Sequence, residues 1–467
     1  PPNLMSKLYL IAHKAHPTAL THHYFIDGPL SGADVWMGSG DGKEKNAADW
    51  KTILVFGEGR GAVNYGWSSS PSCDAGINPT YDESGTVKYK YYCGYHALNV
   101  TDSPSTPTYL WNVNFTNEAR AAQAPYFGDP WSKMQLGRIR INVDGVDTEK
   151  WVGFVGGGYN ATDLKNGSDK RGKGFFVVDL STGQVLWSFT NGSTNTSTSH
   201  TDMDYSLPAG PAIIDTDNDG FIDAAYIGDL GGNVWRFKFC RNADMSSSSS
   251  CGISNWSANL FYDSSTGAIR PIFTIPSAAK DKKGNLWIYW GTGDKINPTE
   301  PSAQEHFYGV KDLDRNATYT LSDIVNLSSD TQTYSDALGK VGYRIQLNGQ
   351  GEKVLADPVV FGGVVYFTTY RPPDASNLCL QAGSAYLYGI KYTTGAGALE
   401  SGRNMFLGAG ISSSPIISVG PDGKRLYVTV SGGAGISGQT IKVSHTPAGR
   451  ANMTNMIYWK DKRIETN

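Results

Sequence analysis

The sequence predicts an all-β fold, and three observations support this prediction. The first is composition, because the 467 residues include 55 Gly, 12 Trp and 26 Tyr, while charged residues make up only 18%. Aromatic residues favour strands, and glycine favours the tight turns that connect short strands. The second is a degenerate repeat of strand hairpins, and the third is an acidic loop between two short apolar segments. The formal net charge of −3, without any basic run, gives no reason to expect a nucleic-acid partner.

Each repeat unit begins with a glycine-rich strand and ends with a hairpin whose second strand carries a Trp. The clearest copy spans residues 174–189, where Thr182-Gly183 supplies the turn and Trp187 lies on the second strand. Looser copies follow at intervals of about 55 to 80 residues, a length that fits a four-stranded sheet with one long insert. We therefore expect residues 1–467 to form a single β-propeller domain with long inserts between strands. Two stacked β-sandwiches are the alternative.

The acidic loop at residues 215–223 carries the clearest chemical signal in the chain. It reads Asp-Thr-Asp-Asn-Asp-Gly-Phe-Ile-Asp, with carboxylates at Asp215, Asp217, Asp219 and Asp223. Carboxylates that converge in one tight loop repel one another unless a cation lies between them. Ca²⁺ prefers oxygen ligands and tolerates the irregular geometry of a loop.

The loop matches the first part of an EF-hand loop and then departs from it. The backbone carbonyl of Phe221 takes the seventh position, but Tyr226 stands where an EF-hand places a bidentate Glu. The flanking segments 211–214 and 224–228 are short and apolar, so they predict strands rather than helices. We expect a calcium loop on a β-hairpin, with the four carboxylates and the Phe221 carbonyl as ligands and Asp223 bidentate. An Asp/Gly-rich turn that binds nothing is the alternative.

Five cysteines provide a second chemical signal. Cys73 and Cys93 flank a polar insert, and Cys240 and Cys251 flank a serine-rich loop, so we expect a disulfide in each pair. Closing a loop this short stabilises a protein by roughly 3 kcal/mol in the chain-entropy model. Disulfides persist in oxidising compartments, which predicts an extracytoplasmic location. Cys379 is left over, and it is either free or paired with a part of the protein outside this sequence.

The segment after the acidic loop carries a resemblance to a known family. Residues 226–237 read Tyr-Ile-Gly-Asp-Leu-Gly-Gly-Asn-Val-Trp-Arg-Phe, and with the loop they resemble the C-terminal domain of the PilC/PilY family, proteins associated with the tip of type IV pili. Further matches at 23–28, 289–293, 307–310 and 367–370 extend the resemblance over nearly the whole chain. The resemblance implies a modified propeller of about seven blades, with Ca²⁺ held in the hairpin loop by the residues named above.

The same resemblance implies a function in type IV pilus biogenesis, surface adhesion and twitching motility, with Ca²⁺ occupancy regulating pilus extension against retraction. The implied partners are minor pilins, an N-terminal domain of the same protein, and a host or abiotic surface ligand. The implied location is bacterial and extracytoplasmic: the pilus tip, the cell surface or the outer membrane. The family's von Willebrand-like N-terminal domain is absent from this sequence, which opens on Pro1-Pro2, so we expect a piece of a longer protein. No apolar run approaches the ~20 residues that span a bilayer, so we expect no transmembrane segment.

We expect no enzymatic activity. Residues 57–61 are glycine-rich but lack the spacing of a dinucleotide-binding turn, and the acidic stretch 142–147 reads as a plain hairpin. The hairpin from Asp179 to Trp187 also resembles blades of pyrroloquinoline-quinone-dependent dehydrogenases, which makes such an enzyme one alternative. The chain has no two adjacent cysteines, however, and an acidic loop within a blade hairpin lies out of reach of a cofactor in the central channel. A carbohydrate-binding surface propeller is a further alternative, because the many Trp and Tyr could form a sugar-stacking platform.

Overall fold

The chain is an all-β protein. The computed structural model describes residues 25–62, 77–81, 87–102, 106–115, 124–160, 169–192, 202–241, 251–265, 267–301, 304–373, 382–420, 423–431 and 438–442. Within these residues the only helical elements are short 3-10 segments: η2 (Ala47–Asp49), η3 (Gly59–Ala62), η5 (Ala124–Tyr126), η7 (Ile253–Asn255), η8 (Leu321–Asp323) and η9 (Asp336–Leu338). The predicted fold class is therefore confirmed. None of the helices in these segments has the length and apolar character needed to cross a membrane.

The chain divides into two compact units. The first comprises Pro1–Ile275 with Asn316–Tyr319, and the second comprises Pro276–Arg315 with Thr320–Asn467. The expectation of one propeller domain over the whole chain stays a prediction.

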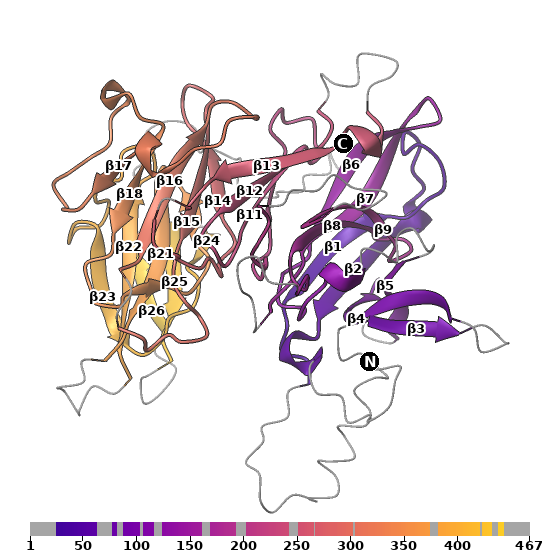
Figure 1. Cartoon of the computed structure of the whole chain (residues 1–467), viewed down its shortest axis with the longest axis horizontal. Helices are drawn as coiled ribbons and strands as arrows, with labels where there is room; N and C mark the ends of the chain where they lie inside the picture. The colour runs from indigo at the N-terminus through magenta and orange to yellow at the C-terminus, as the bar shows by residue number, and fades with distance from the viewer. Residues whose placement is uncertain are drawn as a thin grey trace, which may run out of the picture. The chain divides into compact units, whose positions relative to one another are not determined.

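In its described residues the first unit contains three antiparallel sheets, coloured indigo to magenta in Figure 1. One sheet has the order β1-β2-β4-β3, with β5 also paired to β4: β1 (Leu30–Trp36), β2 (Trp50–Gly57), β3 (Ile77–Tyr81), β4 (Val87–Asn99) and β5 (Thr108–Phe115). The next runs in chain order: β6 (Gln135–Val143), β7 (Val146–Gly156), β8 (Gly174–Asp179) and β9 (Val185–Thr190). The last also runs in chain order: β10 (Ala212–Ile214), β11 (Ala224–Gly228), β12 (Val234–Lys238) and β13 (Ser257–Tyr262).

The second unit also contains three sheets in its described residues. The first has the order β14-β15-β16-β18-β17, with β17 parallel to β18: β14 (Ser277–Lys280), β15 (Leu286–Gly291), β16 (His306–Asp312), β17 (Ile324–Leu327) and β18 (Gly342–Gln346). The second has the order β19-β21-β22-β23, with β20 paired to β21: β19 (Lys353–Val354), β20 (Val359–Phe361), β21 (Val364–Arg371), β22 (Ser384–Lys391) and β23 (Asn404–Ala409). The third contains β24 (Ile416–Gly420), β25 (Gly423–Thr429) and β26 (Gly438–Lys442). The number of blades stays a prediction.

The clearest sequence repeat forms the hairpin that its pattern predicts. Residues 174–189 fold as β8 and β9, and Gly183 turns the chain with a φ of +74°, a conformation that costs glycine little. Trp187 is buried in the core of the first unit. Phe175 stacks on Phe237 of β12 with ring centroids 3.8 Å apart, so aromatic side chains join this sheet to the next one along the chain.

A second repeated turn has the pattern Asp-x-x-Gly-Asn-x-Trp, which the repeat defined from Thr-Gly turns and Trp strands does not predict. Between β11 and β12, the Asp229 carboxylate accepts hydrogen bonds from the backbone N–H groups of Gly231 and Asn233 at 2.8 and 2.9 Å. The same carboxylate accepts bonds from the side chains of Asn233 and Trp235, each at 3.0 Å. The turn between β14 and β15 repeats all four bonds with Asp281, Lys283, Asn285 and Trp287. One carboxylate therefore fixes both the turn and the Trp of the following strand.

Candidate metal centre

The acidic loop joins β10 to β11, two short antiparallel strands in the first unit. Asn218 and Gly220 have φ angles of +61° and +91°, and these left-handed conformations reverse the chain within a few residues. Asn and Gly are the residue types that adopt this conformation most readily, which is why the acidic run folds here as a tight loop. The flanking segments are strands, as their apolar sequences predict.

Three of the predicted ligand side chains come together. Asp215, Asp217 and Asp223 offer carboxylate oxygens that all lie within 4.8 Å of one another. Asp217 is exposed, whereas Asp223 is only 1% exposed, so this negative charge is partly withdrawn from water. Like charges at this separation repel, and burial weakens the screening that water provides. The donor set contains only carboxylate oxygens, which fits a hard cation such as Ca²⁺.

The loop is held in shape by its own side chains. Asp215 accepts hydrogen bonds from the backbone N–H groups of Gly220 at 2.7 Å and of Asp219 at 3.2 Å. Asp223 accepts a bond from the Thr216 backbone at 2.9 Å and another from its hydroxyl at 2.7 Å. Such side-chain to backbone bonds stabilise a turn locally, so the carboxylates are grouped by the folded chain itself.

Asp219 points to a different partner from the other three acids. Its Oδ1 accepts a hydrogen bond from the Phe221 backbone at 2.8 Å, and its Oδ2 lies 3.6 Å from Nη1 of Arg140 on β6. Burial raises the pKa of Asp219, and the nearby charges of Asp217 and Asp215 act in the same direction. The predicted ligand set is thus arranged as a group of three with a fourth carboxylate beside it.

The Phe221 side chain anchors the loop while its carbonyl stays available. Phe221 is 8% exposed, and the guanidinium carbons of Arg138 and Arg140 lie 4.5 and 4.3 Å from the centroid of its ring. Contacts of this kind contribute roughly 0.5–2 kcal/mol each, depending on how far they are withdrawn from water. Within the described segments, no hydrogen-bond donor reaches the Phe221 carbonyl oxygen. An acceptor without a partner is what the predicted backbone ligand requires.

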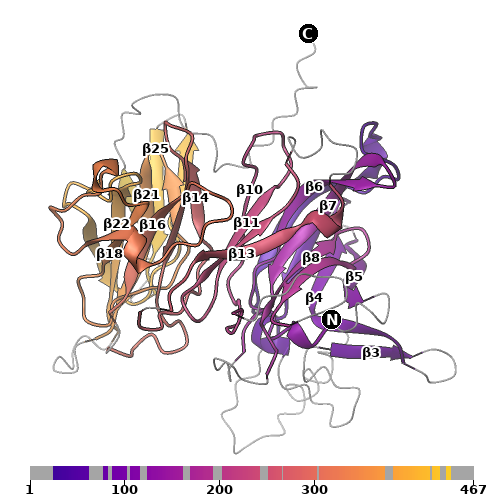
Figure 2. The same cartoon turned by 45° about the horizontal axis from the view of Figure 1, so that its top comes forward.

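The acidic loop packs against strand β6, and Figure 2 shows β10 beside β6. The Ile222 N–H donates to the Arg138 carbonyl at 2.8 Å, and Arg138 Nε donates to the Gly220 carbonyl at 2.7 Å. Gly137 permits this close approach, because a Cβ there would lie 2.8 Å from Ile222 and 3.2 Å from Ile213. The loop is therefore fixed to the neighbouring sheet by backbone and side-chain contacts together.

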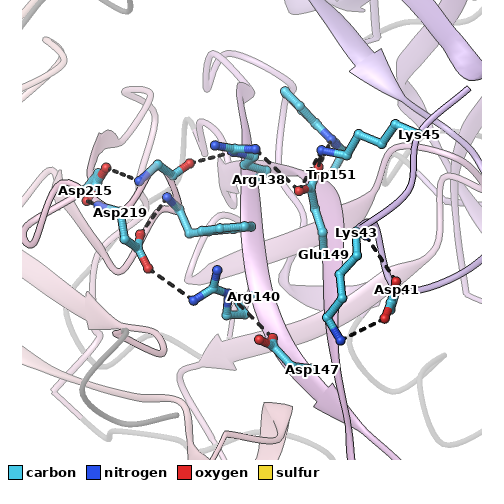
Figure 3. Close-up of polar contacts among 12 residues, drawn as sticks. Asp41, Lys43, Lys45, Arg138, Arg140, Asp147, Glu149, Trp151, Asp215 and Asp219 are labelled. Atoms are coloured by element: carbon cyan, nitrogen blue, oxygen red, sulfur yellow. Dashed lines mark hydrogen bonds and ion pairs between the residues drawn. The ribbon is translucent and has the colours of Figure 1, made fainter. Parts of the chain in front are cut away.

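Behind the arginines, Glu149 of β7 extends the polar network toward the connection between β1 and β2 (Figure 3). Its carboxylate lies 3.4 Å from Arg138 Nη1 and accepts hydrogen bonds from Lys45 at 2.7 Å and from Trp151 Nε1 at 2.8 Å. None of these residues is predicted from the sequence, because sheet packing brings them to the loop and they share no local motif with it.

One predicted disulfide lies within the described residues. Cys240 and Cys251 are joined, with their Cα atoms 5.8 Å apart, directly after β12. Cys73 and Cys379 lie outside the described residues, so the pairing of Cys73 with Cys93 stays a prediction.

The other motifs have structural roles. The glycine-rich stretch 57–61 holds a buried Glu58 whose carboxylate lies 2.8 Å from His96 Nε2. The acidic stretch 142–147 is the β6–β7 turn, closed by a bond from the Gly145 N–H to the Asn142 side chain at 2.9 Å. In the described part of the chain no Trp is among the exposed large hydrophobic residues, whereas Tyr109 and Tyr427 are, so the carbohydrate-binding alternative stays untested.

The fold and the loop together define an all-β repeat protein with a candidate cation site on one hairpin. Residues 92–333, just over half of the 467, match the family described as the PilY1 beta-propeller domain. The chain therefore belongs to the PilY1 β-propeller domain family, which confirms the resemblance stated from the sequence.

Known relatives agree with this assignment. The type IV pilus biogenesis factor PilY1 homolog of Xylella fastidiosa is 25% identical over 432 residues, covering 86% of this chain and 25% of the relative. The type IV pilus biogenesis factor PilY1 of Pseudomonas aeruginosa is 22% identical over 448 residues, covering 85% of this chain and 32% of the relative. The chain thus spans about a quarter to a third of the length of these relatives.

A solved structure shares the fold. The crystal structure of the Pseudomonas aeruginosa PilY1 C-terminal domain matches with a TM-score of 0.55 and 19% identity, covering 87% of this chain and 83% of that chain. This likeness concerns the fold, and it favours the propeller over two stacked sandwiches.

Proposed function

We propose that this domain is the calcium-binding part of a type IV pilus biogenesis factor, in which Ca²⁺ occupancy of the loop at 215–223 regulates pilus extension against retraction. The pilus role is supported by the relatives, which are named type IV pilus biogenesis factors. The calcium role rests on one observation: Asp215, Asp217 and Asp223 present oxygens within 4.8 Å of one another. When bound, Ca²⁺ would neutralise these charges and tie the end of β10 to the start of β11.

The ligand set that we propose follows from the positions of the donors. Asp215, Asp217 and Asp223 bind from the places they already occupy, and the Phe221 carbonyl completes the backbone side of the site. Asp219 joins after it turns from Arg140, 3.6 Å away, toward the other acids. The buried Asp223 provides two oxygens and so replaces the Glu that an EF-hand has and this loop lacks.

The proposed location is the bacterial pilus tip, the cell surface or the outer membrane. The Cys240–Cys251 disulfide supports an oxidising, extracytoplasmic environment. The proposed partners are minor pilins, the N-terminal part of the same protein, and a host or abiotic surface ligand to which the domain adheres.

We propose that the domain has no enzymatic activity. The relatives are named biogenesis factors, and the acidic loop lies in a hairpin connection. No observation on the described residues favours a dehydrogenase or a carbohydrate-binding role over this proposal.

Calorimetric titration with Ca²⁺ tests the site directly. Asp217→Ala removes one ligand from an exposed position, so we expect the affinity to fall at least about tenfold, which corresponds to ~1.4 kcal/mol, with the β spectrum unchanged. The matched control is Asp144→Asn, which removes an exposed acid from the neighbouring β6–β7 turn and leaves the affinity unchanged. An unchanged affinity in Asp217→Ala would reduce the loop to a turn without a ligand.

The regulatory part has a separate test in cells that carry the full-length protein. Asp217→Ala leaves the loop without Ca²⁺, whereas Asp217→Lys places a fixed cation in the loop and partly restores its charge balance. We expect the two variants to shift surface piliation and twitching in opposite directions. The same phenotype in both variants would contradict regulation by occupancy.

A further inference from the structure

Two arginines on β6 face the acidic loop side by side, but they do not play the same part. Residues 138 and 140 lie two apart on a strand, so their side chains leave the same face of the sheet. Both guanidinium groups lie against the Phe221 ring, one at 4.5 Å and the other at 4.3 Å. Beyond that shared contact, their partners differ.

Arg138 contacts groups that are not among the proposed Ca²⁺ ligands. Its Nε donates to the Gly220 carbonyl at 2.7 Å, and its Nη1 lies 3.4 Å from Glu149. Glu149 is in turn held by Lys45 and Trp151, so Arg138 braces the loop without contacting a ligand carboxylate. Figure 3 shows this row of contacts above the one made by Arg140.

Arg140 lies between two carboxylates, one of which is a proposed ligand. Its Nη1 is 3.6 Å from Asp219, and its Nε is 3.5 Å from Asp147 on β7. Glu149 stands directly opposite Arg140 in the β6–β7 register, but its oxygens are engaged by other residues. When Asp219 turns away, Arg140 therefore keeps Asp147 as an ion-pair partner, so its positive charge is still balanced.

We propose that Arg140 determines the calcium affinity of the loop by competing with the cation for Asp219. Without Ca²⁺, the guanidinium satisfies Asp219 and holds it beside the group of three acids. For Asp219 to serve as a ligand it must give up that ion pair, and the remaining positive charge of Arg140 continues to oppose the cation. The residue thus sets the Ca²⁺ concentration at which the loop fills, and this inference rests on the proposed calcium function.

The test is a Ca²⁺ titration by calorimetry in low salt. Arg140→Met keeps much of the packing on Phe221 but removes the competing charge, so we expect the affinity to rise about tenfold, or ~1.4 kcal/mol. Arg140→Lys keeps a positive charge and should stay close to the wild type. The advantage of Arg140→Met should shrink as NaCl is raised, because salt screens charges that are partly exposed to water.

Lys150→Met is the matched control, since it removes one positive charge from the same strand pair at a site where Lys150 binds Asp179 at 3.2 Å instead of the loop. We expect its Ca²⁺ affinity to equal that of the wild type. An equal gain in Lys150→Met, or an affinity in Arg140→Met that is unchanged or weaker, overturns the role of Arg140. If Arg140→Met loses its β spectrum, Arg140→Gln replaces it with the same expected result. A wild type that binds no Ca²⁺ refutes the proposed function itself, which separates the two failures.

Discussion

The repeated Asp-x-x-Gly-Asn-x-Trp turn allows one carboxylate to be compared in two surroundings. In the first unit, Asp229 is 0% exposed and so is Trp235, whose indole N–H it accepts. In the second unit, Asp281 makes the same bonds but is partly exposed. We expect Asp229→Ala to be far more destabilising than Asp281→Ala, although each removes the same four hydrogen bonds.

The expected loss of stability depends on how many of the four donors can hydrogen-bond to water after Asp is replaced by Ala. A buried donor left without an acceptor costs about 1–3 kcal/mol, so the enclosed donors around position 229 predict a total loss of about 3–5 kcal/mol. At position 281 water replaces much of the carboxylate, and the expected loss is about 1–2 kcal/mol. For units of this size each kcal/mol lowers the melting temperature by about 2–4 °C, so the two variants should differ by several degrees.

The assay is thermal unfolding monitored by Trp fluorescence, with hydrogen exchange at the two turns as a local readout. Asp229→Asn is the matched control, because it keeps the size and one acceptor oxygen and should lose less than Asp229→Ala. Equal shifts in the melting temperature for Asp229→Ala and Asp281→Ala would refute the reasoning, since burial would then not decide the cost.

Two further predictions concern pH and the disulfide. Burial raises the pKa of Asp229 to about 7, against the opposing hydrogen bonds. Between about pH 4 and 7 the folded state therefore retains a proton there that the unfolded state, with a pKa of ~3.9, has lost. The melting temperature of the wild type should fall relative to that of Asp229→Asn as pH rises from about 4 to 7. Asp281 should behave oppositely, because its hydrogen bonds together outweigh burial and lower its pKa, so acid removes its contribution as pH falls below about 4. Each sign is measured as the melting temperature of the wild type against the Asn variant at that position, Asp229→Asn or Asp281→Asn, and the same direction of pH dependence at both positions would contradict the expected opposition. The Cys240→Ser, Cys251→Ser double variant should lose roughly 3 kcal/mol of stability yet keep its β spectrum, and an unchanged melting temperature would contradict a stapling role.

The sequence predicts best what is determined locally. The acidic loop could be placed on a hairpin because its spaced acids, the Gly220 turn and the apolar flanks are all within a few residues of one another. The hairpin at 174–189 follows for the same reason. The turn at Asp281 is also local, but it is not predicted. The repeat is defined by Thr-Gly turns and Trp strands, and that definition does not include the Asp-x-x-Gly-Asn-x-Trp spacing.

The orientation of Asp219 could not be predicted in the same way. Spacing alone places it with the other acids, whereas the structure turns it toward Arg140, a residue of β6 in the preceding sheet. Which side chains of β6 face the loop depends on the packing of two sheets, and Gly137 makes that packing close. The local sequence of the loop therefore predicts the proposed ligands but not the arginine that lies beside one of them.

The charge balance of the site explains why that arginine matters. The loop brings four carboxylates, and the two arginines in contact with it bring two positive charges, so β6 offsets part of the negative charge of the loop. A dication bound as proposed would offset more of the remaining negative charge than a monovalent ion would. Behind this layer Glu149 is paired with Lys45, and Asp147 has a side chain 41% exposed to water, so both weigh less on the balance. β6 therefore does more than support the hairpin: its two arginines offset part of the charge of the four acids in one loop, and the proposed dication would offset more of it.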